Sequence, residues 1–434
     1  MKIAVIGTGI SGNAAAYKLA HAGVDLVVYE RDDRIGGHSA TRTIDYDGVK
    51  MNVDTGFIVY NELNYPHFTQ LINELGVETL ESDMSFALTA NEGQFEWCGQ
   101  ESDWRTVLNG LFAQRSNLFS WSYLKMLLEI LRFQREARAD LHSHRIGSMT
   151  LGAYLQSRKF SLRLQQDYII PMGAAIWSMS PTAMLDFPAL SFFSFFENHR
   201  LLQWNRPKWR TIKGGSVFYV RALTKIFADK IRISRGVTGI ESIGDQVYVT
   251  DSSGHIETFD HVIIATHAPE ALAILKNATP LEHEVLGSIK TAPNDVYLHR
   301  DPHFMPKRHA AWASWNFLRQ NDETAPITLT YWMNRLQKLD KNRPLFVTLN
   351  PSTPPNPKLI FSHAIFYHPQ MTQDAITAQK RLKEIQGTRQ IWYCGAWTGF
   401  GFHEDGLKSG LEIAQDILKL LHPDGETSEL QAAQ

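Results

Sequence analysis

The spacing of apolar residues predicts a strand, a helix and a second strand within the first 30 positions. Residues 2–6 and residues 25–29 are short apolar runs, and residues 13–22 between them are small or helix-forming. Glycines separate the first run from the helical stretch, and Glu30 ends the second run. Short apolar runs bounded by turn residues favour buried strands, and a helix between them favours parallel pairing. We therefore predict a βαβ unit at the start of the chain.

Patterns of the same kind return in two later parts of the chain. Residues 52–60 are strand-like, residues 217–228 are helical, and residues 231–234, 237–242, 246–250 and 261–266 predict four more strands. A last apolar run at residues 390–394 precedes a turn and a final helix at residues 406–421. We expect an α/β protein with one Rossmann-type domain assembled from residues 1–80, 210–270 and 388–422.

The intervening blocks differ from these parts in composition. Residues 100–204 are rich in aromatic side chains at helical spacing, and residues 271–385 mix tryptophans with many prolines. We predict that residues 81–209 and 271–387 form an inserted α+β domain for the substrate. Residues 423–434 are mostly polar, and we predict a flexible tail because few of their side chains can be buried.

A glycine-spaced turn between the first strand and the first helix is the most informative motif. Gly7 permits a tight turn, Gly9 lets backbone N–H groups approach a pyrophosphate, and Gly12 lets the helix pack close to the strand. The N-terminus of that helix offers unpaired N–H donors and a partial positive charge to phosphate. Glu30 stands where a carboxylate accepts hydrogen bonds from a ribose. Strand, turn, helix and acid together predict a dinucleotide site.

A second glycine turn follows the ribose-binding acid and favours FAD over NAD. Arg31 and Arg34 precede the pair Gly36-Gly37. A plain nicotinamide site does not need this turn. Guanidinium groups beside a glycine turn suit a cofactor whose diphosphate continues into a ribityl chain.

Composition and charge narrow the classes of function. The 434 residues carry a formal net charge of −2, so no global field favours nucleic acid as a partner. Cys98 and Cys394 lie far apart without metal-ligand spacing, which fits a reducing, cytoplasmic compartment. No apolar run is long enough to span a membrane, and the first strand leaves no room for a signal peptide. His299, His303 and His309 occupy a proline-rich segment, where we predict surface positions and no metal.

Several motifs together resemble the FAD-dependent amine oxidase and phytoene desaturase superfamily. The likeness extends over nearly the whole chain and is greatest to a bacterial branch of NAD/FAD-binding flavoproteins. That branch includes enzymes linked to the desaturation of methylated fatty acyl chains. Besides the two glycine turns and Glu30, the motifs that carry the resemblance are Asp54-x-Gly56, Lys213-Gly214-Gly215, Val237, Ala265-Thr266, Gly395-Ala396-Trp397-Thr398 and Glu404-Asp405-Gly406-Leu407-Lys408-Ser409-Gly410.

The resemblance implies a glutathione-reductase-like FAD domain that binds the cofactor non-covalently. It implies that Val237 presents its backbone to the adenine and that Gly395 lies against the ribityl-phosphate region. Asp405, Gly406 and Leu407 are expected at the N-terminus of the last helix, near flavin N1 and O2, where a helix end stabilises negative charge. The full set of expected FAD-binding residues is Gly7, Gly9, Ile10, Ser11, Gly12, Glu30, Arg31, Arg34, Gly36, Gly37, His38, Gly56, Phe57, Val237, Gly395, Asp405, Gly406 and Leu407.

Two positions depart from the superfamily pattern. His38 follows the Gly-Gly pair where members usually have arginine, and Ala396 follows Gly395 where many have an acid. No cysteine is placed for covalent attachment of flavin, and Cys394 fits a buried strand position. These departures count against the amine oxidase role and leave FAD binding intact.

The catalytic candidates surround the expected flavin site. Flavin takes the hydride, so the protein needs an apolar, shaped pocket more than a nucleophile. His403, Trp397 and Tyr331 are the candidates, and His403 either relays a proton or makes a hydrogen bond at the helix entrance. Other aromatic residues expected near the pocket are Trp177, Trp332, Phe400 and Phe402.

A basic and aromatic segment offers a surface for lipid. Residues 115–145 combine aromatic and aliphatic side chains with lysine and arginine, and residues 199–210 repeat this mixture with Trp204 and Arg206. Such helices either bind an anionic membrane surface peripherally or pack as ordinary amphipathic helices with solvated arginines.

Three functions are compatible with these observations. The first is an FAD-dependent oxidoreductase that desaturates a large hydrophobic substrate, a lipid acyl chain such as a methylated fatty acyl group. The second is a flavin amine oxidase that acts on a small or medium amine, which a pair of aromatic rings flanking the flavin would favour. The third is a non-catalytic FAD-binding protein.

Overall fold

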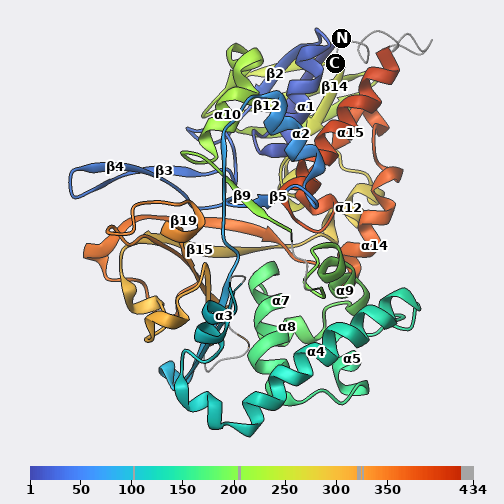
Figure 1. The fold of residues 1–434 in the computed structure, drawn as a ribbon. Coiled ribbons are helices and arrows are strands. Elements are labelled where there is room, and N and C mark those ends of the chain that lie inside the picture. Colours follow the sequence, from blue (N-terminus) through green and yellow to red (C-terminus); the bar gives the residue numbers. More distant parts are fainter. Residues whose placement is uncertain (101–102, 204–206, 320–323, 325–326, 422–434) are drawn as a thin grey trace.

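A five-stranded parallel sheet forms one half of the computed structural model, which describes residues 1–100, 103–203, 207–319, 324 and 327–421 (Figure 1). The strand order is β10-β2-β1-β14-β20, and every neighbouring pair is parallel. The strands are β1 (Lys2–Ile6), β2 (Asp25–Tyr29), β10 (Ile231–Arg232), β14 (His261–Ile264) and β20 (Ile391–Tyr393). Three separate parts of the chain therefore build one sheet.

The alternation of side chains along β1 explains the layers around this sheet. Ile3 and Val5 share a core with the helices α1 (Ile10–His21) and α15 (His403–Leu421). Ala4 and Ile6 share a different core with the antiparallel strands β11 (Val237–Ile243), β12 (Gln246–Asp251) and β13 (Ile256–Phe259). Because successive side chains of a strand point to opposite faces, the sheet is buried on both sides, as parallel sheets require.

The helices α1 and α15 come from opposite ends of the described chain and touch backbone to backbone. A Cβ at Gly410 of α15 would lie 2.1 Å from the carbonyl oxygen of Ser11 in α1, and a Cβ at Gly406 would lie 2.8 Å from Cγ2 of Ile10. Glycine at these two positions therefore sets how closely the first and last helices pack.

A seven-stranded sheet organises the other half of the molecule. Its strand order is β19-β15-β18-β17-β16-β7-β8, and all pairs are antiparallel except β16 with β7. The strands are β7 (Phe86–Ala90), β8 (Phe95–Gly99), β15 (Thr291–His299), β16 (Trp315–Leu318), β17 (Thr328–Trp332), β18 (Phe346–Leu349) and β19 (Ile360–Pro369). The sheet shares the largest hydrophobic core with the helices beside it.

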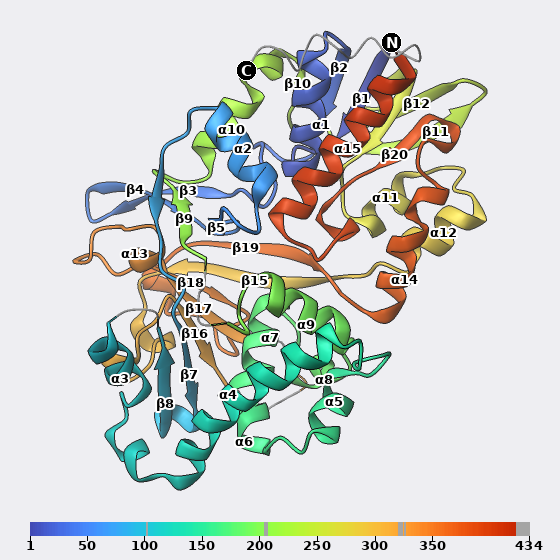
Figure 2. The same ribbon diagram turned by 45° about the vertical axis from the view of Figure 1, so that its right-hand side comes forward.

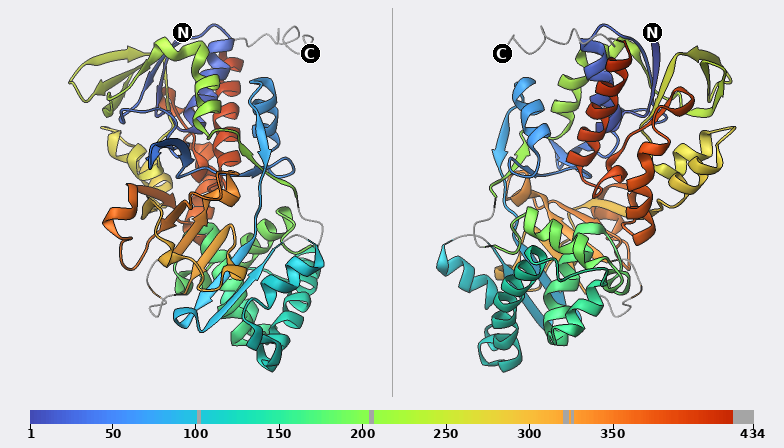
Figure 3. Two further views of the ribbon diagram at one scale, coloured as in Figure 1. Left: turned by 60° about the vertical axis from the view of Figure 1, so that its left-hand side comes forward. Right: turned by 90° about the vertical axis from the view of Figure 1, so that its right-hand side faces the viewer.

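The helices beside the second sheet come from one continuous segment (Figure 2). They are α3 (Trp104–Leu111), α4 (Trp121–His142), α5 (Leu151–Ser157), α6 (Leu162–Leu164), α7 (Ile170–Trp177), α8 (Pro181–Leu185) and α9 (Ala189–Asn198). Both views in Figure 3 place this segment at the end of the molecule opposite the N-terminus.

Short elements complete the fold. They are the hairpin β3 (Thr41–Tyr46) and β4 (Val49–Asp54), the small sheet β5 (Tyr60–Asn61), β9 (Trp209–Ile212) and β6 (Thr79–Glu81), and the helices α2 (Pro66–Glu74), α10 (Val217–Thr224), α11 (Ala268–Ile274), α12 (Pro280–Gly287), α13 (Met333–Leu336) and α14 (Gln373–Arg381). The predicted fold class, a Rossmann-type α/β unit with an α+β part, is confirmed. The predicted domain limits stay predictions.

Several predicted boundaries differ from the structure. The strands β1 and β2 match their predicted ranges, but α1 and α15 each begin three residues earlier than predicted. Residues 52–60 are not one strand, because β4 ends at Asp54 and β5 begins at Tyr60. The predicted tail, Trp204 and Arg206 lie outside the described residues.

The predicted surface position of His299 is wrong. His299 is fully buried in β15, and its Nε2 atom lies 2.7 Å from Oγ1 of Thr348. Burial lowers the pKa of His299 to about 4, so the imidazole is neutral. A neutral imidazole with a hydrogen-bond partner fits an interior that would exclude a charged one. His303 and His309 are exposed, as predicted.

Candidate functional site

A cavity of about 540 Å³ extends from the turns of the parallel sheet to the second sheet. Its nucleotide end, as we name it, is lined by the two glycine turns and the residues after β2 and β14. Its substrate end is lined by side chains from β7, α7, α9, β16 and β17. Of the expected FAD-binding residues, the cavity wall includes Gly7, Gly9, Ile10, Ser11, Glu30, Arg31, Gly36, Gly37, His38, Gly56, Phe57, Val237 and Gly395.

The N-terminus of α1 opens onto the nucleotide end without a side chain to cap it. Gly9 is the N-cap, no side chain hydrogen-bonds to the first turn, and the first turn carries no acid. A Cβ added to Gly9 would meet no atom within 4 Å, so the position faces open space. Uncapped N–H groups and the helix dipole make this a site for a phosphate group.

The two glycine turns are locked together. The Gly36 N–H donates to the carbonyl oxygen of Thr8 at 3.0 Å, and a Cβ at Gly37 would lie 3.0 Å from Cα of Gly9. Gly7 has φ +102° and Gly36 has φ +110°, which side chains rarely adopt. Gly12 does not line the cavity, since its Cβ would lie 2.0 Å from the Gly7 carbonyl oxygen. Its role is the close packing predicted for it.

Glu30 retains one free acceptor position at its carboxylate. Oε2 accepts the N–H of Thr8 at 2.9 Å and the hydroxyl of the same residue, and Oε1 accepts the N–H of Asp32 at 2.9 Å. A carboxylate has about four acceptor positions. The remaining position on Oε1 suits one ribose hydroxyl, because Glu30 lines the cavity beside Val237.

The two arginines after Glu30 have different positions. Arg31 lines the cavity and lies 3.2 Å from Oε1 of Glu270. Arg34 does not line the cavity. Its guanidinium donates to the Gly37 carbonyl oxygen at 2.8 Å and so braces the second turn. Burial, followed by the neighbouring Arg42, lowers the pKa of Arg34.

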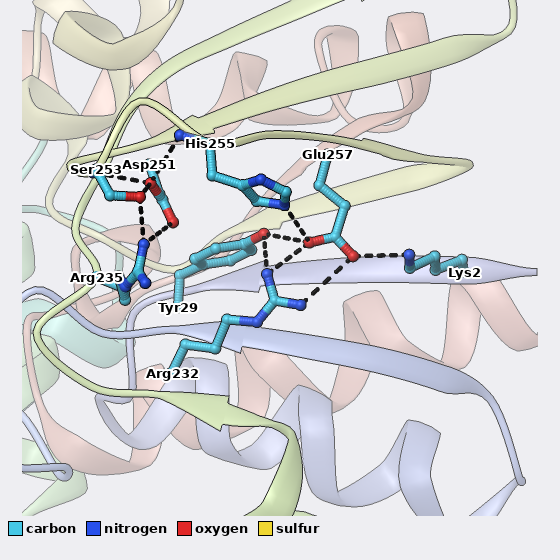
Figure 4. A network of polar contacts seen from close by, with 8 residues as sticks. All are labelled: Lys2, Tyr29, Arg232, Arg235, Asp251, Ser253, His255 and Glu257. Carbon is cyan, nitrogen blue, oxygen red and sulfur yellow. Dashed lines mark hydrogen bonds and ion pairs between the residues drawn. The ribbon is translucent and has the colours of Figure 1, made fainter.

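A polar network joins β2 to its neighbours β1, β10 and β13 and so fixes the strand that ends just before Glu30 (Figure 4). The carboxylate of Glu257 accepts hydrogen bonds from Lys2 at 2.7 Å, from the Tyr29 hydroxyl at 3.0 Å and from Arg232 at 2.5 Å. Burial alone would raise the pKa of Glu257, but these donors outweigh it and hold the pKa at about 2. Glu30 follows Tyr29 directly, so the network positions the acid that we expect to bind a ribose.

Asp54 joins the middle of the cavity wall to α10. The sequence analysis gave Asp54 no role of its own. It is buried, and it accepts the Ser216 N–H at 3.0 Å and the Gln337 side-chain N–H at 2.8 Å. Burial raises its pKa to about 6. A Cβ at Gly56, two residues on, would lie 2.0 Å from the His38 carbonyl oxygen. The motif Asp54-x-Gly56 was the sequence signal that could have indicated this role of Asp54.

The N-terminus of α15 is displaced from its predicted position. The Gly406 N–H donates to the Phe402 carbonyl oxygen at 3.1 Å, so the unpaired first-turn positions are residues 403–405. Asp405, Gly406 and Leu407 do not line the cavity. The Asp405 carboxylate accepts the Phe402 N–H at 2.9 Å and caps its own helix, and burial raises its pKa to about 6. The Glu404 carboxylate caps α2 by accepting the Phe68 N–H at 3.0 Å.

His403 is held by its neighbours at the centre of the cavity wall. Its ring stacks on Phe57 at 3.7 Å, and its Nε2 atom lies 2.8 Å from the hydroxyl of Tyr219. That hydroxyl also contacts the Ser39 hydroxyl. Burial lowers the pKa of His403 to about 3, so the imidazole is neutral. The hydrogen bond at the helix entrance exists, and the proton relay stays a prediction.

The other two catalytic candidates also line the cavity. The Trp397 indole N–H donates to the Thr266 carbonyl oxygen at 2.9 Å, and its ring belongs to a hydrophobic core. Tyr331 lies within β17, and its ring packs edge-on against Trp315 at 5.0 Å. Burial raises the pKa of Tyr331, so its hydroxyl is neutral.

The substrate end is apolar and aromatic. Phe195 and Phe402 stack directly at 4.8 Å and 20°, and the His199 ring stacks on Phe195 at 3.8 Å. Among the described lining residues the carboxylates are Glu30, Asp32 and Glu270, and all three belong to the nucleotide end. Wall residues that the sequence did not indicate are Met84, Phe86, Met172, Ile176, Val296, Trp315, Leu336, Leu349, Phe366 and His368. Most come from strands that were not predicted.

The nucleotide end fits FAD. The uncapped helix, the open space at Gly9, the free acceptor position of Glu30 and the second turn suit a diphosphate with a ribose on one side and a longer chain on the other. His38 adds a polar atom to the wall. Its Nε2 atom is buried and has no hydrogen-bond partner among the residues that the structure describes.

Known proteins resemble this chain in sequence. The family model for flavin containing amine oxidoreductase matches residues 10–364. A Caenorhabditis elegans protein, lysine-specific histone demethylase 1B homolog, is 35% identical over 94 residues, and the 15-cis-phytoene desaturase of Synechococcus elongatus is 26% identical over 187 residues. The matched segments cover 21% and 42% of this chain, and only 11% and 38% of the two relatives.

Solved structures match over almost the entire chain. Putrescine oxidase bound to putrescine has a TM-score of 0.67 and 14% identity, covering 96% of this chain and 99% of its own. Cyclohexylamine oxidase from Brevibacterium oxydans has a TM-score of 0.66 and 17% identity, and the match covers 97% of this chain and 99% of that one. A CLA-producing fatty acid isomerase from P. acnes has a TM-score of 0.65 and 14% identity, and the match covers 95% of this chain and 98% of that one. At these identities the likeness establishes a shared fold.

Proposed function

The chain belongs to the flavin-containing amine oxidoreductase family, and from this premise we propose that it is an FAD-dependent desaturase of a lipid acyl chain. The substrate class is a long hydrocarbon such as a methylated fatty acyl group. The reaction removes two hydrogens from adjacent carbons and leaves a carbon–carbon double bond. Bound FAD supplies the acceptor for the hydride.

The residues of the nucleotide end would hold the cofactor. The first turn of α1 would bind the diphosphate, Glu30 would accept a ribose hydroxyl, and the backbone at Val237 would face the adenine. The chain would thereby place a carbon–hydrogen bond of the substrate in the middle of the cavity. Gly56 and His403 line the wall there.

The observation that carries the proposal is the apolar substrate end. An amine substrate is a cation at neutral pH, and burying a cation without a partner is expensive. No carboxylate lines this end within the described parts of the chain, and the histidines there are neutral, since burial lowers the pKa of His199 and of His368 to about 4. An uncharged hydrocarbon needs no such partner, and the removal of water from it favours binding.

The second hydrogen leaves as a proton. The imidazoles of His199, His368 and His403 line the cavity and are the side chains that could receive this proton, although burial lowers their pKa values and makes them weak bases. The His403 imidazole is also positioned through Tyr219. The aromatic wall of Phe195 and Phe402 excludes water from this region.

Amine oxidation is the competing function, because two of the similar solved structures are amine oxidases. A pair of rings with a slot between them would favour it. Phe195 and Phe402 are in direct stacking contact and therefore form one wall without a slot. Among the described lining residues, the amine assignment consequently lacks a carboxylate at this end, and the stacked pair Phe195 and Phe402 leaves no slot between its rings.

The test is anaerobic mixing of the purified holoenzyme with phospholipid that carries methyl-branched acyl chains. We expect loss of the oxidised flavin absorbance, and mass spectrometry should show acyl chains lighter by two hydrogens. A parallel series of primary amines and diamines should leave the absorbance unchanged. Bleaching by an amine and not by the lipid would overturn the proposal in favour of amine oxidation.

A further inference from the structure

Several large apolar side chains project into solvent on α3, on the 3₁₀ turn η2 (Arg115–Phe119) and on the start of α4. Phe119 is 89% exposed, Trp121 is 76% exposed and Trp104 is 67% exposed. Leu108, Leu118, Leu128 and Leu131 on the same elements are exposed as well. Isolated exposed apolar residues are ordinary, but a group on neighbouring elements marks an interaction site.

The outward face of α4 mixes apolar and basic side chains. Trp121, Lys125, Leu128 and Arg135 recur at spacings of four, three and seven residues, and all four are exposed. These spacings place them on one side of a helix. The opposite side, with Tyr123, Met126 and Phe133, is buried in the core, so this helix presents its second apolar stripe to solvent.

Contacts between the elements hold them as one surface. The Arg163 guanidinium beside Leu162 donates to the Ser122 hydroxyl at 2.6 Å, which joins α6 to the first turn of α4. The Arg115 guanidinium donates to the Asn109 side chain at 2.7 Å, which joins η2 to α3. Leu162 is itself 70% exposed. Figures 1 and 2 place these elements at the end of the molecule opposite the N-terminus.

The charge on this surface is mainly positive, and the exposed acid at its edge is Asp103, the N-cap of α3. Between Trp104 and Arg135 the single acid is Glu129, which is buried and accepts a hydrogen bond from Ser161. Arg105, Arg115, Lys125 and Arg135 are exposed, and none of them has an acidic partner in the part of the chain that the structure describes. Exposed aromatic and leucine side chains surrounded by unpaired cations are complementary to an anionic bilayer, which offers both an apolar layer and negative headgroups.

We propose that this docking surface, formed by α3, η2, residues 121–135 of α4 and α6, binds an anionic lipid membrane peripherally. Phe119 and Trp121 insert at the boundary of the headgroups and acyl chains, and Lys125 and Arg135 contact the headgroups. No described helix is long and apolar enough to cross a membrane. The proposal concerns a surface remote from the nucleotide end and does not depend on which substrate is oxidised.

The experiment is sedimentation of the holoenzyme with vesicles of phosphatidylcholine, with and without phosphatidylglycerol. We expect the protein to pellet with the anionic vesicles at low salt and to return to the supernatant at high salt, because screening weakens the headgroup contacts. The double variant F119S/W121S should bind at least tenfold more weakly. The variant K125Q/R135Q should lose its preference for the anionic vesicles.

Matched controls separate docking from folding and from turnover. Ile233 is 48% exposed and far from this surface in the fold, so I233S should sediment like the unchanged protein. Flavin content and circular dichroism of each variant report its folding. Recovery of the unchanged protein in the supernatant with anionic vesicles would overturn the proposal. So would equal binding by F119S/W121S, or a dimer in solution that this variant dissociates while no vesicle is bound.

Discussion

The two ends of the cavity use different parts of the polypeptide. At the nucleotide end the wall is backbone: glycines at positions 7, 9, 36 and 37 and an uncapped helix, with the charged Glu30, Arg31 and Glu270 beside them. The hydrogen bond from His267 holds the pKa of Glu270 at about 2. At the substrate end the wall is side chains, and its titratable groups are neutral. This contrast is what we expect if one end binds a charged, fixed ligand and the other binds an uncharged one.

This difference explains what a substitution can change at each end. Backbone that must approach a phosphate closely tolerates almost no added atom, so the motif is narrow. Side chains that exclude water can be exchanged for others of similar volume and polarity. The expected cofactor site can therefore be predicted from a sequence motif, whereas the residues of the expected substrate site can be identified only from the three-dimensional structure.

The largest expected effect is at Gly12. Gly12→Ala places a Cβ 2.0 Å from the Gly7 carbonyl oxygen, which forces α1 away from β1. We expect loss of folded, yellow protein, measured by circular dichroism and flavin absorbance.

Gly9→Ala is the matched variant, because its Cβ meets nothing within 4 Å and its φ of −63° is ordinary. It should fold, yet bind FAD at least about tenfold more weakly, equivalent to about 1.4 kcal/mol. Unchanged FAD affinity in the Gly9 variant would contradict the assignment of the diphosphate to this turn.

The next effect is at the substrate end. Ile176→Glu places a carboxylate among apolar wall residues, where desolvation of the charge costs several kcal/mol. We expect FAD content to be retained while the affinity for a fluorescent fatty acid falls at least about a hundredfold, as measured by titration. Ile176→Leu should change the affinity less than about threefold. Loss of flavin from the Glu variant would show that the two ends are not separable.

The smallest effect is on stability in acid. Burial lowers the pKa of His199, His299 and His368 to about 4. Below about pH 6.5 these histidines bind protons in the unfolded chain, but in the folded chain they stay neutral down to about pH 4. The free energy of unfolding therefore falls as the pH drops from 6.5 to 4. Asp54 and Asp405, whose pKa burial raises to about 6, act in the opposite sense, but they are outnumbered.

We expect the Tm of the holoenzyme to be at least about 2 °C lower at pH 5 than at pH 7, by circular dichroism. His299→Asn removes one titrating group while leaving a donor for Thr348, and it should reduce this difference. A Tm that stays level or rises toward pH 5 would show that these histidines are protonated in the folded chain.

The two halves of the fold also differed in how well the sequence predicted them. The apolar runs of β1 and β2 are bounded by turns and acids, so their limits were predicted to the residue. Most strands of the second sheet were not found, because polar residues such as His299 and Thr348 are buried in it, where they lie 2.7 Å apart. His299 was misplaced for that reason. A polar residue whose partner lies far along the chain gives no local signal of burial.

The two ends of the cavity differed in the same way in how well the sequence predicted their residues. The glycine turns were predicted because their function requires glycine, whereas Met172 and Phe366 could not be identified as wall residues before the second sheet was known. The start of α15 was predicted wrongly because Asp405, which was expected near the cofactor, caps α15, and the neighbouring Glu404 caps α2.

The contact of Gly410 with Ser11 sets an order of events during synthesis. The helix α1 leaves the ribosome long before α15, the helix that it must touch, and before the edge strand β20. Until α15 and β20 have been synthesised, the nucleotide end is incomplete, and Ile3 and Val5 lack part of their cover on one face of the sheet. We therefore expect the cofactor to bind only after α15 has been synthesised.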